Sequence, residues 1–108
     1  MYHFAENLFM TETIKPDINR IKFKLYSGIG MMSLCLITFS SNSKDVFDIY
    51  PIEYFKQKGL RKRDFYIAGI AENKSAAMEL VSDMIIEALE NKDDGVSLRD
   101  YLERQIKW

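Results

Sequence analysis

The chain has 108 residues, which suffices for one compact domain with a single hydrophobic core but not for two independently stable domains. Hydrophobic residues make up 47% of the sequence, which excludes a chain that is disordered throughout. Fifteen basic and sixteen acidic residues leave a net charge of −1, so no long-range field would attract nucleic acid or an anionic membrane. We therefore expect one domain, residues 1–108, and no nucleic-acid partner.

No segment has the properties of a membrane span or an export signal. The longest apolar run, "GIGMMSLCLITF", falls well short of the roughly 20 residues that cross a bilayer. The N-terminus lacks the basic start and long apolar stretch of a secretion signal. Cys35, the single cysteine, cannot form a disulfide within the chain, which is typical of a reducing compartment. We predict a cytoplasmic protein without a membrane partner.

The first ten residues are rich in large apolar side chains, and two interpretations of them stay open. They include Tyr2, Phe4, Leu8, Phe9 and Met10. Such side chains are costly to leave in water and are common at interfaces between proteins. The segment either folds back onto its own sheet as part of the core or forms a surface on which a second copy docks.

Residues 16–27 fit both a strand and a helix. In "IKFKLY" apolar residues alternate with lysines, which is the pattern of a strand with one exposed face. Ile14, Ile18, Ile21 and Leu25 also recur at helical spacing. We favour the strand, because "SGIG", residues 27–30, would then join it to the following strand as a hairpin.

Two short apolar runs predict buried strands, each followed by a helix. The run "LCLITF", residues 34–39, precedes a helix expected at 51–58, where Pro51 would occupy the first turn. The run "FYIAGIA", residues 65–71, precedes a longer helix. A strand, a crossover helix and a second strand form a right-handed unit, so we expect the two strands to be parallel neighbours.

The clearest helix is predicted at 74–91, with Asn73 or Ser75 capping its first turn. Its apolar face has residues at offsets of three and four, namely Ala77, Leu80, Val81, Met84, Ile85, Ala88 and Leu89. A last helix is expected at about 98–106, beginning at a capping-box-like pair of Ser97 and Asp100. Together the elements predict an α/β (or α+β) fold. It has a small mixed three-stranded sheet, with one hairpin pair and one parallel pair, packed by three or four helices.

The loops that follow the two predicted strands form the candidate ligand site. Residues 40–45 and 71–75 would leave the same end of a parallel pair, where open α/β sheets usually bind ligands. The second loop also leads into a helix N-terminus, which favours a phosphate or carboxylate. The residues expected to touch a small anionic ligand are Ser41, Asn42, Asn73, Lys74 and Ser75. The alternative is that these residues only cap helices and make turns.

The sequence offers little for an enzyme. His3, the only histidine, lies near the N-terminus and Cys35 lies in a predicted buried strand, so we expect neither a catalytic pair of the two nor a transition-metal site. The carboxylates considered for acid–base or Mg²⁺ chemistry are those of Asp45, Asp48 and Glu53, which are more often caps or solvated charges. The basic run "KQKGLRKRD" is interpreted as a solvated loop. We assign no catalytic residue, metal or cofactor.

The segments "LCLITFSSNSKDVFDI" and "DFYIAGIAENKSAAMELVSDMI" resemble a group of short bacterial proteins of unknown function. The resemblance covers about residues 18–90 and rests on the strand followed by two serines and an asparagine, and on "YIAGIA" followed by a helix. It implies the strand–helix arrangement and a bacterial cytoplasmic setting. No catalytic residue comes with it.

Two functional hypotheses follow. The first is a non-enzymatic interaction or regulatory module that self-associates as a homodimer, with an unidentified protein as a further partner. The alternative is a module that binds a small anionic ligand between loops 40–45 and 71–75. Self-association ranks first, because a small sheet leaves one face and both edges incompletely covered.

Overall fold

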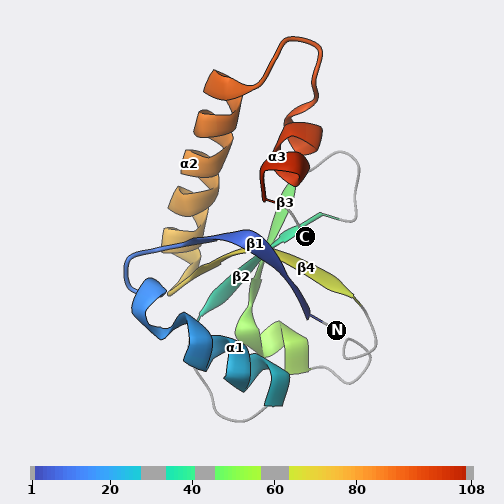
Figure 1. Cartoon of the computed structure of the whole chain (residues 1–108). Coiled ribbons are helices and arrows are strands. Elements are labelled where there is room, and N and C mark those ends of the chain that lie inside the picture. Colours follow the sequence, from blue (N-terminus) through green and yellow to red (C-terminus); the bar gives the residue numbers. More distant parts are fainter. Residues whose placement is uncertain (1, 28–33, 41–45, 57–63, 107–108) are drawn as a thin grey trace.

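The computed structural model describes residues 2–27, 34–40, 46–56 and 64–106 (Figure 1). Within these ranges it contains a four-stranded sheet, three α-helices and two short 3-10 helices. In chain order they are β1 (Tyr2–Met10), η1 (Lys15–Asp17), α1 (Ile18–Ser27), β2 (Cys35–Phe39), β3 (Phe47–Pro51), η2 (Ile52–Lys56), β4 (Phe65–Ala71), α2 (Lys74–Asn91) and α3 (Leu98–Ile106). The predicted α/β class is confirmed, but the sheet has four strands instead of three.

The sheet is mixed, with the strand order β1-β4-β2-β3. β1 and β4 are parallel, whereas β2 is antiparallel to both of its neighbours, β4 and β3. The expected parallel pair and hairpin pair are therefore both present, but they are made by strands other than those we predicted. β4, the last strand in the chain, lies in the interior of the sheet, and β1, the first strand, lies at its edge.

The apolar N-terminal segment is part of this sheet. β1 pairs with β4 from Tyr2 opposite Phe65 onward, with an irregularity in the register between Phe4 and Phe9. Phe4 packs against the core on one face of the sheet, and Ala5 is buried on the other face. Of the two interpretations of this segment, the structure shows the first, because the segment completes its own sheet. The free docking arm of the second interpretation is not what these residues form.

α1 is a helix at the place where we favoured a strand, so that prediction is wrong. Ile21 is only 1% exposed and Ile18 and Leu25 pack beside it, whereas Phe23 is 70% exposed. A strand would have turned Phe23 to the same side as Ile21. The helical spacing of the isoleucines and Leu25 therefore decided the structure. The hairpin predicted at 27–30 depended on that strand, so the reason for expecting it is lost. Residue 27 ends α1, and residues 28–30 lie outside the described residues.

β3 is a strand that the sequence analysis did not predict. It pairs antiparallel with β2, and its last residue, Pro51, lies opposite Cys35. Ile49 packs toward α2 and Tyr50 toward α1, which is the alternation of a strand. The helix predicted at 51–58 is reduced to the 3-10 helix η2, beyond which the chain lies outside the described residues. Pro51 is tolerated at the end of β3 because β3 is an edge strand.

Helices cover both faces of the sheet, with α1 on one face and α2 and α3 on the other (Figure 1). The core under α1 includes Leu36 and Ile67, both fully buried. The core under α2 and α3 includes Ala68, Met84 and Leu102. Burying a large apolar side chain of this kind contributes about 1.5–3 kcal/mol, so these two layers supply most of the driving force for folding.

α2 and α3 have the predicted bounds, and their N-termini are capped by side chains. The Oδ1 atom of Asn73 accepts a hydrogen bond from the backbone N–H of Ala76 at 2.8 Å. The hydroxyl of Ser97 accepts one from the backbone N–H of Asp100 at 3.1 Å. Gly95, with φ of 86°, adopts the left-handed conformation in the turn between the two helices, where glycine is favoured. Each cap contributes about 1 kcal/mol.

Candidate functional site

The predicted ligand crevice loses its geometric basis, because β2 and β4 are antiparallel and the prediction of a parallel pair was wrong. Cys35, at the start of β2, pairs with Ala71, at the end of β4. The loops that begin at residues 40 and 71 therefore leave the sheet from opposite ends. Ser41 and Asn42 lie outside the described residues.

The other three residues of that prediction, Asn73, Lys74 and Ser75, lie together at the N-terminus of α2. Asn73 is the N-cap, and its side chain is already bonded to the helix backbone. Lys74 and Ser75 are exposed in the first turn. Beside them the carboxylate of Glu72 accepts a hydrogen bond from the hydroxyl of Thr11. This arrangement is that of a capped helix, and a neighbouring carboxylate opposes the binding of an anion.

Cys35 is buried, and burial raises the pKa of its thiol above the ordinary value of 9.0. The negative charge of Glu53 acts in the same direction and the positive charge of Lys74 opposes it. The folded protein therefore holds this proton more tightly than the unfolded chain does. The stabilisation that results is present at neutral pH and is lost as the pH rises through the raised pKa. A thiol of this kind is a poor nucleophile at neutral pH.

We expect Cys35 to react slowly with Ellman's reagent at pH 8 in the folded protein and rapidly after unfolding in urea. The reason is that unfolding removes both the burial and the raised pKa. The measurement is the release of the coloured thiolate with time in the two states. Equal rates in the folded and unfolded states would contradict the prediction.

His3 lies in β1 and is held in a defined position by contacts with β4 and the residue before it. Its ring stacks on that of Tyr66, with centroids 4.8 Å apart, and its Nε2 atom is 3.1 Å from Oδ1 of Asp64. These residues lie at the start of β4, whereas Cys35 pairs with Ala71 at its other end. At about 3.3 Å per residue, the length of β4 separates His3 from Cys35 by well over 10 Å. The two side chains are therefore too far apart to form a hydrogen bond with each other.

A hollow of about 420 Å³ lies at the end of the sheet where β2 ends and β4 begins. The described residues that line it are Thr38, Phe39, Ser40, Asp48, Tyr50, Asp64, Phe65, Tyr66, Arg99 and Glu103. Several of its polar groups bond to one another within the chain. Nε of Arg99 is 3.1 Å from the Glu103 carboxylate, and the hydroxyl of Tyr50 donates to Asp48 at 3.3 Å. Of this set the sequence analysis considered only Asp48.

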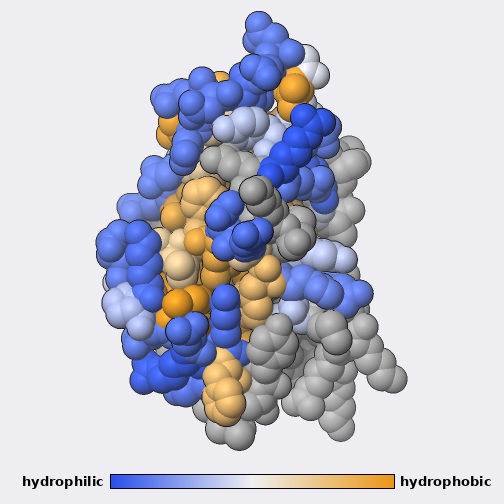
Figure 2. All heavy atoms as spheres, in the orientation of Figure 1, coloured by the Kyte–Doolittle hydropathy of each residue, from blue (hydrophilic) through white to orange (hydrophobic). Residues whose placement is uncertain are grey.

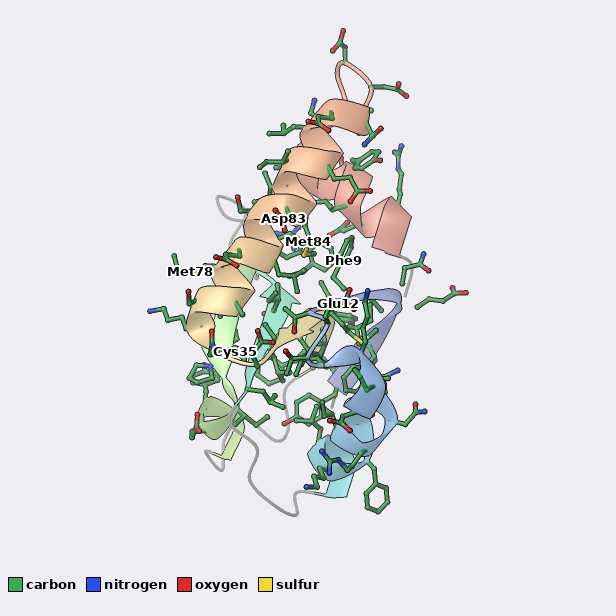
Figure 3. The ribbon with its side chains drawn as sticks, turned by 90° about the vertical axis from the view of Figure 1, so that its left-hand side faces the viewer. Phe9, Glu12, Cys35, Met78, Asp83 and Met84 are labelled. Carbon is green, nitrogen blue, oxygen red and sulfur yellow. The ribbon has the colours of Figure 1, made fainter. Side chains whose placement is uncertain are left out.

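The outer face of α2 carries a second set of apolar side chains, which we call the outer stripe: Met78, Ile85, Ile86 and Leu89. Met78 is 57% exposed, Ile86 52% and Leu89 55%. Five large hydrophobic side chains are strongly exposed among the described residues, and three of them lie on this one helix. Figure 3 shows Met78 pointing away from the sheet and Met84 pointing toward it. α2 is therefore apolar on two faces.

The sequence analysis placed Ile85 and Leu89 on the core face of α2, because all its apolar positions were read as one face. The residues of α2 that are fully buried are Ala77, Met84 and Ala88. Successive residues of a helix are about 100° apart, so Ile85 and Leu89 lie about that far around the helix from Met84 and Ala88. The signal for two faces was present in the spacing, since Met78, Ile85 and Leu89 share one line along the helix.

Comparison with models of protein families, with curated proteins and with solved structures finds no match. What can be stated of the class is therefore structural: an α/β-type protein with a four-stranded mixed sheet and three α-helices in the described ranges. Among the described residues, no group of three or more His, Cys, Asp or Glu side chains could hold a metal ion. None of the described helices is long and apolar enough to cross a membrane.

Proposed function

We propose that the protein is a non-enzymatic interaction module that forms a homodimer through the outer stripe of α2. The observation that carries the proposal is the exposure of Met78, Ile86 and Leu89, each to more than half of its surface, along one helix. Exposed apolar groups gathered in this way mark interaction surfaces, whereas single exposed apolar residues are ordinary. A helix face that is exposed to solvent does not need apolar side chains for the helix itself to fold.

The chemistry of the described side chains supports a non-enzymatic role. The Cys35 thiol is buried with a raised pKa, and His3 lies at the other end of the sheet. A cysteine nucleophile is activated by a neighbouring base, by a lowered pKa or by a metal ion, and Cys35 has a raised pKa and lies far from His3.

The edge strand β1 is the competing surface for self-association. Figure 2 shows apolar residues in the middle of one face of the molecule, around β1 and between α1 and α2. Phe4 and Leu8 of β1, however, pack against the core of their own chain. The irregular register between Phe4 and Phe9 also interrupts the flat edge that strand pairing needs. The outer stripe is the better candidate because Met78, Ile86 and Leu89 are each more than half exposed.

A second copy is the partner that the stripe fits best. A two-fold dimer uses the same surface on both subunits, and it is the commonest assembly of soluble proteins. Pairing two copies of α2, a helix of about 27 Å, would remove from water the exposed parts of Met78, Ile86 and Leu89. After the cost of association, we expect a dissociation constant on the order of micromolar, equivalent to about −8 kcal/mol.

Replacing Leu89 with glutamate should convert the dimer into monomers of 12.7 kDa. The dissociation constant should rise more than tenfold, because pairing would bury two uncompensated charges, at a cost above about 1.4 kcal/mol. Sedimentation equilibrium over a micromolar concentration series measures the mass, and far-UV circular dichroism checks that the helices remain.

Phe23→Glu is the matched control. It places the same charge at an apolar residue that is 70% exposed but lies on α1, so the dimer should persist. A wild-type protein that stays monomeric throughout the series would overturn the proposed function. A Leu89→Glu variant that dimerises as well as the wild type would exclude the outer stripe as the dimer interface.

A further inference from the structure

We infer that the two α2 helices of the dimer run parallel and in register, with Lys74 of each copy paired with Glu79 of the other. This inference rests on the proposed function and specifies the geometry of the same surface. It follows from the order of side chains along α2, which suits one direction of pairing and opposes the other.

The outer face of α2 has the spacing of a two-stranded coiled coil. Met78, Ser82, Ile85 and Leu89 are separated by four, three and four positions, which are the alternating core positions of a heptad. Met78 and Leu89 are strongly exposed, Ser82 is exposed and Ile85 is half-buried, so this line of residues is open to a second helix. Ser82, in the middle, is small enough to let the two helices approach closely.

The residues that flank this line differ on its two sides. Lys74 and Val81 lie on one side, and Glu79 and Ile86 lie on the other. In a parallel pair, each residue of the first side faces the residue five positions later on the second copy. Lys74 then faces Glu79, and Val81, which also packs against the core of its own chain, faces Ile86. Opposite charges meet, and apolar side chains meet.

An antiparallel pair would place equivalent sides of the two helices against each other. With Met78 opposite Leu89 of the second copy, Glu79 would lie beside Ile86 of that copy. A carboxylate would then be moved out of water against an apolar side chain without a cation to compensate it. Parallel helices do align their dipoles unfavourably, but that effect is small at exposed helix ends and is screened by salt. The flanking residues therefore favour the parallel pair.

The side of α2 that the sheet and α3 cover is not the side used in this arrangement. The buried residues of α2, Ala77, Met84 and Ala88, face the sheet and α3. The outer stripe lies on a different side of the helix, and Figure 3 shows Met78 directed away from the body of the protein. Among the described residues, the outer stripe therefore lies away from the buried side of α2.

Disulfide cross-linking of full-length variants tests the direction. Cys35 is first replaced by alanine, and Met78→Cys, Leu89→Cys and Glu87→Cys are then made singly in that background. In the parallel dimer the Met78→Cys variant should cross-link to itself on mild oxidation, and so should Leu89→Cys. Glu87, which lies on the exposed side of α2 away from the stripe, is the control and should give no cross-link.

A mixture of the Met78→Cys and Leu89→Cys proteins separates the alternatives. If the helices are antiparallel, the mixture should yield the mixed disulfide between positions 78 and 89, identified by mass spectrometry of the linked peptide, while neither variant links to itself. That result overturns the parallel arrangement but keeps the dimer. A wild-type chain that is monomeric in sedimentation overturns the proposed function itself.

Charge reversal gives a second readout that does not depend on cysteine. Lys74→Glu should weaken the dimer by about fivefold, because it replaces two attractive contacts by two repulsive ones at the surface. Adding Glu79→Lys to the same chain should restore the wild-type dissociation constant. If the double variant dimerises as weakly as Lys74→Glu alone, Lys74 and Glu79 do not pair in the dimer.

Discussion

Deleting the first ten residues should unfold the protein and not merely release folded monomers. These residues contain β1, which pairs with β4 and contributes Phe4, Leu8 and Met10 to the core beneath α1. Removing even one large core side chain costs about 2–5 kcal/mol, and a whole domain is stable by only about 5–15 kcal/mol. Loss of the strand should therefore cost more free energy than the whole stability of the domain. Circular dichroism and the dispersion of an NMR amide spectrum measure the result.

The control for this deletion is Glu6→Ala, a change in an exposed residue of the same strand. It should alter stability by no more than about 0.5 kcal/mol, as surface substitutions usually do. A truncated chain that keeps a cooperative unfolding transition and a dispersed spectrum would contradict the prediction. That outcome would mean that residues 2–10 serve as a detachable arm, in line with the other interpretation of their apolar character.

Leu102→Ala should lower the free energy of unfolding by about 2–5 kcal/mol. Leu102 is 1% exposed and lies in the core cluster with Met84 and Ala88, where it attaches α3 to α2 and the sheet. The substitution leaves a cavity that these neighbours fill only in part, so transfer and cavity terms both oppose folding. Urea unfolding at a protein concentration too low for the proposed dimer to form measures the change in the monomer.

Leu89→Ala is the matched control, since it removes the same atoms from a helix position that is 55% exposed. Monomer stability should change by less than about 0.5 kcal/mol, whereas the dissociation constant of the dimer should rise. The pair of variants thus separates the core contact between α3 and α2, which contains Leu102, from the exposed apolar face of α2, which contains Leu89. Equal losses of stability in the two variants would show that Leu89 belongs to the core.

Local sequence signals predicted the second half of the chain well. α2 and α3 begin at side-chain caps, Asn73 and Ser97, and the apolar residues within them recur at helical spacing. β2 and β4 are short runs of β-branched and other apolar residues, a length and composition that predict buried strands. In each case the information lay within about twenty residues, where propensity, capping and periodicity agree.

Pairing between distant segments could not be predicted in the same way. The expectation that β2 and β4 are parallel assumed that the chain between them crosses over as a helix. In fact β3 reverses direction as a strand at the sheet edge, and β1 enters from the N-terminus to supply the parallel neighbour of β4. In α1 both periodicities were present, and the burial of Ile21 against the sheet decided between them. In both cases contacts with distant segments decided what the local pattern left open.

The position of the exposed apolar residues was not predicted. An apolar surface for a second copy was expected at the N-terminal segment, because the aromatic residues there looked too numerous for a terminus. The sheet absorbed that segment, and the exposed apolar residues lie instead on α2. The ligand crevice depended on the relative direction of β2 and β4, so it was lost when that direction proved to be antiparallel.

The interior position of β4 has a consequence for how the protein is made. His3 and Asp64, which meet across the β1–β4 pair, are 61 positions apart in the chain. Ribosomes add about 5–20 residues per second, so β4 is synthesised about 3–12 seconds after β1. The β2–β3 hairpin has both strands available earlier. The nascent chain thus carries its aromatic first strand unpaired for most of translation, and in a cell this interval is when chaperones have the greatest opportunity to bind it.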